Sequence, residues 1–257
     1  MSKIHCEYRK NGSVAAITLN DGKGNIVDRA MMEEIQTLLN SLKENSALKL
    51  IVFAGAGKHF SYGASVEEHK KENAAAMLKS FHALFYTIRD LSIPCMAKIT
   101  GQCLGGGLEL ALMCDILFAD RTARLGQPEI ALGVFPPPAS IILPEKIGLA
   151  RAEDLLITGK IISADEGYMY GLLNSVSESR EAMDAMAEEW INAYILPRSA
   201  SSLRFAVRAA RIKFNHVLSN FLPQLESLYL DKLMETKDAN EGINSFIEKR
   251  KPNWYNN

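Results

Sequence analysis

Two glutamates in apolar surroundings, 20 positions apart, are the residues best placed to do chemistry. Glu109 follows the glycine run at 105–107, and Glu129 precedes a proline-rich segment at 136–138. A buried carboxylate is costly unless it is paired or opens on a cleft. Two such acids can hold a water molecule and transfer protons, because burial can push their pKa values apart. Each also has a plain structural explanation, as an acid satisfied by arginine or backbone, or as a surface acid.

The glycines before Glu109 offer a second kind of chemistry. Glycine lets a backbone approach a ligand closely, and the first N–H groups of a helix have no partner within the helix. Helix N-termini favour negative charge, so this segment suits an oxyanion. A further candidate is the loop at 59–68, which follows the apolar run 48–54, because ligands bind beyond the carboxyl ends of strands in α/β sheets. An ordinary connecting loop fits that segment equally well.

Other site types find little support. The segment 55–58 resembles the end of a phosphate-binding loop, but Val52 replaces its first glycine and His59 its magnesium-binding hydroxyl residue. There is no G-x-S-x-G nucleophile motif, and the five histidines lack metal-ligand spacing. The cysteines have no C-x-x-C pair and are expected to be reduced, buried thiols. They are Cys6, Cys95, Cys103 and Cys114.

The elements that position these residues alternate along the first half of the chain. Residues 13–20, 48–54 and 95–100 are strand-like, whereas 31–42, capped by Asp28, and 74–90 have helical periodicity. This order is typical of an α/β core with crossover connections. A helix from the glycine run through Met113, a strand at 116–119 and a capping box at 163–166 follow.

From about Glu181 the pattern becomes almost entirely helical, with Pro197 and Pro223 expected to interrupt or start helices. We therefore divide the chain into a core at 1–196 and a helical region at 197–257. Three apolar faces favour packing against another subunit over packing on the core. They comprise Met183, Met186, Ala187, Trp190 and Ile191; Phe221, Leu225, Leu228, Tyr229 and Leu233; and Ile243, Phe246 and Ile247.

Overall charge and hydropathy narrow the function class. The chain has 257 residues, 29 basic and 30 acidic, and this balance argues against a nucleic-acid-binding face. The amino-terminal segment has no secretory h-region, and no apolar run approaches the length of a membrane span. These features predict a cytoplasmic enzyme.

Together the segments closely resemble the crotonase (enoyl-CoA hydratase/isomerase) superfamily. Residues 105–116 are similar to its second oxyanion segment with the first catalytic glutamate, and 126–129 to the segment with the second glutamate. Residues 61–64 are similar to the first oxyanion loop, and 241–254 to the closing helix. The resemblance implies a spiral of ββα repeats with a C-terminal helical region that builds homotrimers or homohexamers.

The resemblance also implies roles for individual residues. The N–H groups of Ala64 and Gly106 would bind the oxygen of an acyl-coenzyme A thioester. Glu109 would activate water and Glu129 would deliver a proton, and retention of both acids favours a hydratase over an isomerase or hydrolase. The substrate would contact Ser65, Val66, Gly105, Phe135, Pro136 and Pro137. Coenzyme A is the substrate handle and no cofactor or metal is implied; Lys23, Lys251 and Trp254 could bind it or be solvated surface residues.

Three differences from the usual residues of the family restrict the choice of substrate. Ser65 replaces the usual aspartate, and prolines with Ala139 and Ser140 replace a glycine-rich run, followed by apolar residues at 141–143. Proline fixes φ and removes N–H groups, so this wall of the acyl pocket should be rigid and apolar. The pattern at 60–69 and 134–140 is most similar to the cyclohexa-1,5-diene-1-carbonyl-CoA hydratases of anaerobic benzoyl-CoA degradation.

That resemblance implies 1,4-addition of water, giving 6-hydroxycyclohex-1-ene-1-carbonyl-CoA. Alternatives are a general enoyl-CoA hydratase, a hydratase of cyclohex-1-ene-1-carbonyl-CoA, and a thioester isomerase or hydrolase. A non-catalytic RNA-binding homologue is opposed by the balanced charge and the two retained acids.

Overall fold

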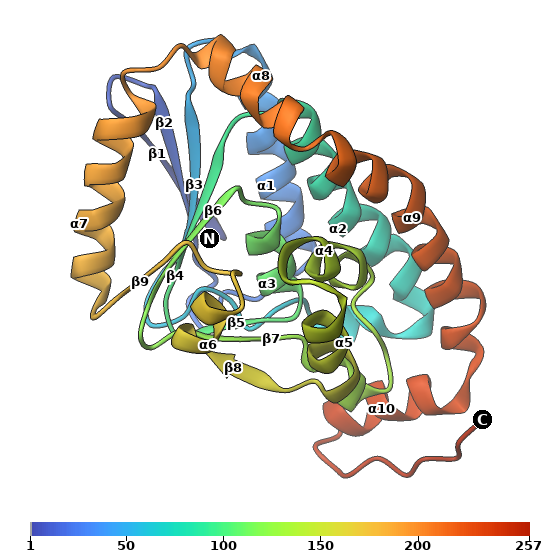
Figure 1. Ribbon diagram of the computed structural model, residues 1–257. Coiled ribbons are helices and arrows are strands. Elements are labelled where there is room, and N and C mark those ends of the chain that lie inside the picture. Colours follow the sequence, from blue (N-terminus) through green and yellow to red (C-terminus); the bar gives the residue numbers. More distant parts are fainter. Residues whose placement is uncertain (1) are drawn as a thin grey trace.

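The computed structural model describes residues 2–257 and is built around a six-stranded sheet, with a smaller three-stranded sheet at one end (Figure 1). The large sheet has the order β1-β2-β3-β4-β6-β9. Its strands are β1 (Ile4–Arg9), β2 (Val14–Leu19), β3 (Leu50–Gly55), β4 (Cys95–Ile99), β6 (Ile116–Asp120) and β9 (Ser175–Ser177). The small sheet contains β5 (Gln102–Leu104), β7 (Arg124–Gly126) and β8 (Ile161–Ser163).

Most strand pairs are parallel, as the alternation of strands and helices predicts. β1 pairs antiparallel with β2, and each later neighbour in the large sheet is parallel. β3 lies in the middle and is buried on both faces, which explains its continuous apolar sequence. The strands expected at 13–20, 48–54, 95–100 and 116–119 are confirmed, whereas β1 and the short strands β5, β7, β8 and β9 were not foreseen.

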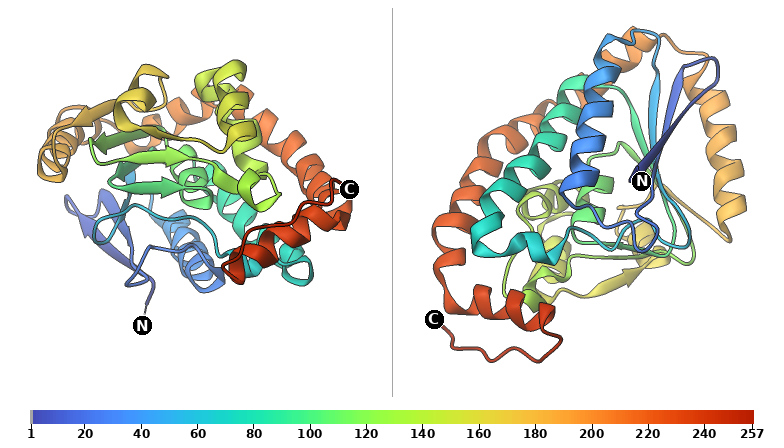
Figure 2. Two further views of the ribbon diagram at one scale, coloured as in Figure 1. Left: turned by 90° about the horizontal axis from the view of Figure 1, so that it is seen from below. Right: turned by 180° about the vertical axis from the view of Figure 1, so that it is seen from behind.

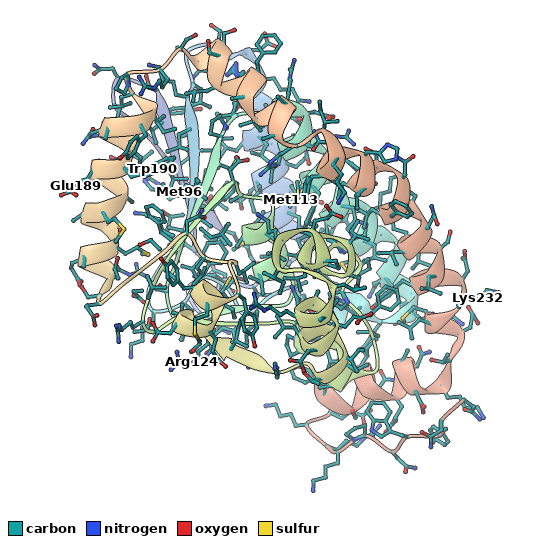
Figure 3. All side chains as sticks on the ribbon, viewed as in Figure 1. Met96, Met113, Arg124, Glu189, Trp190 and Lys232 are labelled. Atoms are coloured by element: carbon teal, nitrogen blue, oxygen red, sulfur yellow. The ribbon has the colours of Figure 1, made fainter. Side chains whose placement is uncertain are left out.

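Helices cover both faces of the large sheet (Figure 2). On one face lie α1 (Arg29–Ser41) and α2 (Lys71–Leu91), and on the other lies α7 (Arg180–Trp190). The apolar side chains of α7 form their own core with alternate strand residues, among them Met96, with Trp190 at its edge (Figure 3). The expected apolar face is present: Met183, Ala187 and Ile191 are buried, and Met186 and Trp190 are partly buried against them. The expectation that this face packs on another subunit rather than on the core is wrong, because it packs on the sheet.

Local caps fix where several helices begin. Asp28 accepts from Met31 N at 3.1 Å, and Ser163 and Glu166 form the expected capping box at the start of α6. Helices in the second half of the core are α3 (Gly106–Leu112), α4 (Pro137–Ile147), α5 (Leu149–Thr158) and α6 (Ala164–Met169). Shorter turns are η1 (Leu42–Glu44), η2 (Val66–His69), η3 (Pro128–Leu132), η4 (Ile191–Ile195) and η5 (Leu233–Glu235).

The C-terminal helices are α8 (Ala200–Ala210), α9 (Ile212–Asp231) and α10 (Lys237–Ile247). α9 runs alongside α2 and α4, and its buried residues belong to the main hydrophobic core. The expectation that Pro223 interrupts a helix is wrong, because Pro223 lies inside α9. The predicted apolar face is also wrong in part: Phe221 and Leu228 are exposed, and the buried face consists of Leu218, Leu222 and Tyr229. No helix among residues 2–257 is both long and apolar enough to cross a membrane.

Candidate active site

A cavity of about 370 Å³ is lined by residues of α2, α3, η3, α4, α9 and α10 and by the loop before η2. Its wall is mostly apolar, with a few polar groups that converge on it. An apolar cavity with few convergent polar groups is the usual form of a small-molecule site. Among the residues that line it are Gly63, Ala64, Val66, His69, His82, Gly105, Gly106, Glu109, Glu129, Phe135, Pro136, Pro137, Tyr229, Gly242, Arg250 and Pro252.

Two glycine-containing turns meet at one end of this cavity. Leu104 N donates to Ser61 O at 3.0 Å, which holds the two segments side by side. A Cβ on Gly63 would lie 3.3 Å from Gly106 N, and a Cβ on Gly106 would lie 3.1 Å from Ala64 N. Only glycine tolerates this approach at Gly63, where φ is +108°.

The N–H groups of Ala64 and Gly106 are free for a ligand. Within residues 2–257, neither donates to a protein acceptor. Gly106 begins α3, so its N–H lacks an acceptor one turn earlier. The structure thus brings together the two donors expected from the sequence, close enough to share one oxygen atom.

Glu109 projects from α3, a helix that is buried on all sides. Its Oε1 accepts a hydrogen bond from Ala139 N at 2.9 Å, at the start of α4. Burial raises the pKa of the Glu109 carboxyl, and the Ala139 hydrogen bond only partly opposes that rise. The acid is therefore neither a surface residue nor part of an arginine pair.

Glu129 faces the same cavity from η3. Its Oε1 lies 2.4 Å from the position that a Cβ on Gly105 would occupy. With its amide nitrogen turned toward Glu129, Gln127 lies 3.2 Å from both carboxyl oxygens. Burial, and then the charge of Glu109, raise the pKa of Glu129 well above its ordinary value. Ionisation of one acid of such a pair therefore makes ionisation of the other less favourable.

The acyl wall contains most of the residues assigned to it from the sequence. Val66, Gly105, Phe135, Pro136 and Pro137 line the cavity. The proline-rich segment forms more than a loop, however, because Pro137 and Pro138 open α4. Proline suits the first turn of a helix, where its missing N–H would have no partner.

Ser65 does not reach the cavity wall. Its carbonyl oxygen lies 2.7 Å from His69 Nδ1, and His69 lines the cavity in its place. Ser65 thus contributes through backbone and through the placement of His69. Burial lowers the pKa of His69, which favours its neutral form.

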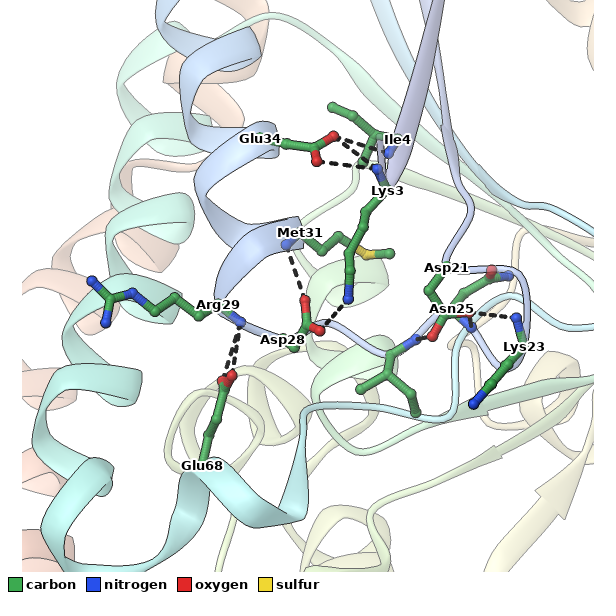
Figure 4. Close-up of polar contacts among 11 residues, drawn as sticks. Lys3, Ile4, Asp21, Lys23, Asn25, Asp28, Arg29, Met31, Glu34 and Glu68 are labelled. Carbon is green, nitrogen blue, oxygen red and sulfur yellow. Dashed lines mark hydrogen bonds and ion pairs between the residues drawn. The ribbon is translucent and has the colours of Figure 1, made fainter. Parts of the chain in front are cut away.

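The three residues suggested for coenzyme A all lie outside the cavity wall. Lys23 sits in a loop that Asp21 closes by accepting from Lys23 N and Asn25 N (Figure 4). Trp254 packs on Gly133 and Gly242, its ring within 3.2 Å of the position of an added Cβ at either glycine. Lys251 lies between Arg250 and Pro252, which do line the cavity.

Polar residues of the cavity that received no role from the sequence include His69, His82 and Tyr229, together with Ser245 and Arg250. Tyr229 is 1% exposed, and its hydroxyl has no hydrogen-bond partner among the described residues. The ring packs edge-on against Phe135, with centroids 5.4 Å apart. Its place in a helical apolar pattern indicated only a packing role. The one available signal was that tyrosine carries a hydroxyl into an otherwise apolar stripe.

Comparisons with known proteins show which family this chain belongs to. The family model described as enoyl-CoA hydratase/isomerase matches residues 9–257. The cyclohexa-1,5-dienecarbonyl-CoA hydratase of Thauera aromatica is 44% identical over 99% of this chain and 98% of its own. The short-chain-enoyl-CoA hydratase of Clostridium acetobutylicum is 30% identical, covering 96% of each chain.

Solved structures share the fold. The enoyl-CoA hydratase from Mycobacterium avium subsp. paratuberculosis gives a TM-score of 0.86 over the full length of both chains at 21% identity. That from Bacillus anthracis gives a TM-score of 0.77 at 30% identity, covering 99% of this chain and 100% of its own. The chain belongs to the enoyl-CoA hydratase/isomerase family and has the crotonase fold.

Proposed function

We propose that this protein is a hydro-lyase that adds water to cyclohexa-1,5-diene-1-carbonyl-CoA by 1,4-addition. The product is 6-hydroxycyclohex-1-ene-1-carbonyl-CoA, as in anaerobic benzoyl-CoA degradation. The observation that carries the proposal is geometric: Glu109 and Glu129 face one cavity, beside the free N–H groups of Ala64 and Gly106. The relative from Thauera aromatica, 44% identical over nearly the whole chain, supports the choice of substrate.

The two N–H groups polarise the thioester. Hydrogen bonds to its oxygen withdraw electrons from the conjugated system and make the β-carbon electrophilic. Because these donors are fixed by Gly63, Gly105 and the start of α3, they need no rearrangement as negative charge develops. Losing one such donor typically costs about a hundred- to a thousandfold in rate.

The acids then complete the addition. Glu109, as the carboxylate, takes a proton from water while the water oxygen bonds to the β-carbon, and electrons move onto the thioester oxygen as a dienolate. Glu129, as the acid, gives its proton to the γ-carbon of the second double bond. The remaining double bond then lies between the α-carbon and the other β-position, and the net change is one water gained. This division of labour needs an ionised Glu109 and a protonated Glu129. The Ala139 hydrogen bond opposes the rise in the pKa of Glu109, whereas the Glu109 charge adds to the rise in the pKa of Glu129.

The proline wall beside Glu109 suits a flat ring. Pro136, Pro137 and Phe135 present rigid, apolar surface to the cavity. A general enoyl-CoA hydratase, or one acting on cyclohex-1-ene-1-carbonyl-CoA, is the second candidate. The 30% identity to a short-chain-enoyl-CoA hydratase favours it. Isomerase, hydrolase and RNA-binding activities follow behind these.

The proposal includes three further properties. The reaction consists of proton transfers and addition of water, so we propose that it uses no cofactor or metal and that dialysis against EDTA leaves it unchanged. The four cysteines are free thiols, which suits the reducing cytoplasm. The exposed Phe205, Ile212 and Phe221 on α8 and α9 suit burial in a homotrimer or homohexamer.

A turnover screen tests the function. The purified protein is incubated with the cyclic diene thioester, cyclohex-1-ene-1-carbonyl-CoA and crotonyl-CoA, and products are read by mass. We expect fastest conversion of the diene, with the mass of one water gained and the thioester intact. Release of free coenzyme A would show a hydrolase, and a preference for crotonyl-CoA would show a general hydratase. Binding of homopolymer RNA that persists at about 0.2 M salt would revive the non-catalytic alternative.

A further inference from the structure

The cavity wall formed by α2 and α9 contains two buried polar atoms without a protein partner. They are the Tyr229 hydroxyl and His82 Nε2, on side chains that are each 1% exposed. Leaving a buried hydroxyl without a hydrogen bond costs about 1–3 kcal/mol. Both residues line the cavity, so the missing partner can be a ligand atom.

Tyr229 is held firmly in this position. Its ring packs edge-on against Phe135, and one turn earlier on α9 Glu226 pairs with His82 Nδ1 on α2. This pair joins α9 to α2 beside the cavity. The phenol is thus presented by a fixed helix rather than a mobile loop.

The hydroxyl acts as a donor. Burial, and then the charges of Glu129 and Glu109, raise the pKa of the Tyr229 phenol, so it keeps its proton. The charges of both carboxylates act on the phenol, but its hydroxyl forms a hydrogen bond with neither carboxylate. All three residues line the same cavity, so one ligand bound there can contact all three groups.

We propose that the Tyr229 hydroxyl donates a hydrogen bond to the oxygen on the substrate's β-carbon. This oxygen belongs to water during the attack and to the hydroxyl group in the product. The inference rests on the proposed hydration. The thioester oxygen is already bound by Ala64 and Gly106, and the ring carbons offer no acceptor, so the added oxygen is the ligand atom left for this donor.

Two unreactive thioesters test the contact. 2-Hydroxybenzoyl-CoA has an oxygen on the β-carbon, benzoyl-CoA lacks it, and aromaticity prevents hydration of both. Their dissociation constants are measured by calorimetry on the native protein and on Tyr229→Phe. We expect Tyr229→Phe to weaken 2-hydroxybenzoyl-CoA about five- to tenfold, the loss of one neutral hydrogen bond, and to leave benzoyl-CoA within about twofold. Comparing the two ligands removes effects common to both, such as altered packing.

The matched control is Tyr168→Phe, which removes a hydroxyl from an exposed tyrosine on α6 and should change neither constant. Turnover of the diene gives the second measurement, where we expect Tyr229→Phe to lower kcat about tenfold with little change in KM. Equal weakening of both thioesters with unchanged kcat would show a packing role and overturn the inference, as would no change in either constant. If the native protein does not hydrate the diene but the selective weakening is observed, the proposed function fails and the Tyr229 contact stands.

Discussion

The Ala139 N–H donates to Glu109 Oε1 at 2.9 Å and is the first N–H that α4 can offer, because Pro137 and Pro138 before it have none. The prolines thus do two things at once. They stiffen the acyl wall, and they leave Glu109 a single donor at the positive end of a helix. This donor stabilises the ionised form of an acid whose burial favours the protonated form.

Replacing Ala139 by proline should therefore impair catalysis without unfolding the protein. Among residues 2–257, Ala139 supplies the only N–H that donates to Glu109. Ala139→Pro removes it, so we expect the pKa of Glu109 to rise further and turnover at neutral pH to fall about tenfold. Proline is tolerated in the first turn of a helix, so α4 should form. Ala139→Gly, which keeps the N–H, is the control. Full activity in Ala139→Pro, measured as kcat between pH 6 and 9, would contradict this role.

Glu109→Gln and Glu129→Gln should each lower turnover by at least about two orders of magnitude, the usual worth of acid–base catalysis. Glutamine keeps the shape and hydrogen-bonding capacity but cannot exchange a proton. Affinity for benzoyl-CoA should change little, since the Ala64 and Gly106 donors remain. Near-normal kcat in either variant would remove that residue from the mechanism.

The pH dependence of the free energy of unfolding should reflect the ionisation of Glu109 and Glu129. Burial raises the pKa of both acids in the folded state above their unfolded values, so the folded protein binds more protons than the unfolded chain. The free energy of unfolding then falls as pH rises from the ordinary carboxyl range, about 4.3, through the raised folded-state values. We expect the double variant Glu109→Gln, Glu129→Gln to lose this decline, as measured by urea denaturation at several pH values. A decline of equal size in the double variant would assign it to other groups.

Features set by local sequence were predictable. The Asp28 cap and the Ser163 capping box depend on residues within one turn, and both formed as expected. β1 was missed because an edge strand alternates polar and apolar residues weakly and gains its stability by pairing with β2. The prediction that Pro223 interrupts or starts a helix was wrong because the surrounding residues of α9, and not the proline alone, decide whether the helix continues.

The same distinction applies to the residues of the site, some of which could be predicted from the sequence and some of which could not. Glu109, Glu129 and the glycine turns were visible in the sequence because acids and glycines are unusual in apolar runs. Tyr229 and His82 were not, because each resembles any other core residue of an amphipathic helix until the cavity beside it is seen. Their polar atoms become notable only in the folded structure, where none of the described residues supplies a hydrogen-bond partner.

A substitution at Gly105 can distinguish an effect on the active site from a general loss of stability. A side chain there meets two obstacles: φ is +50°, and the added Cβ would lie 2.4 Å from Glu129 Oε1. Gly171 also has a positive φ, +79°, with nothing within 4 Å of an added Cβ, so Gly171→Ala is the control for placing alanine at a positive φ without a steric clash. We expect both alanine variants to lose stability from strain, and Gly105→Ala to lose more, because its ψ of −130° lies outside the left-handed helical region that alanine can enter.

Only Gly105→Ala should also displace the Glu129 carboxyl, and we expect it to lower kcat at least about a hundredfold while Gly171→Ala stays near the native rate. Thermal unfolding and kcat measured on the same preparations separate the two effects. Equal kcat values in the two variants would mean that the position of the Glu129 carboxyl against Gly105 does not matter for turnover. Glu129 would then act, if at all, through a different conformation from the one in this cavity.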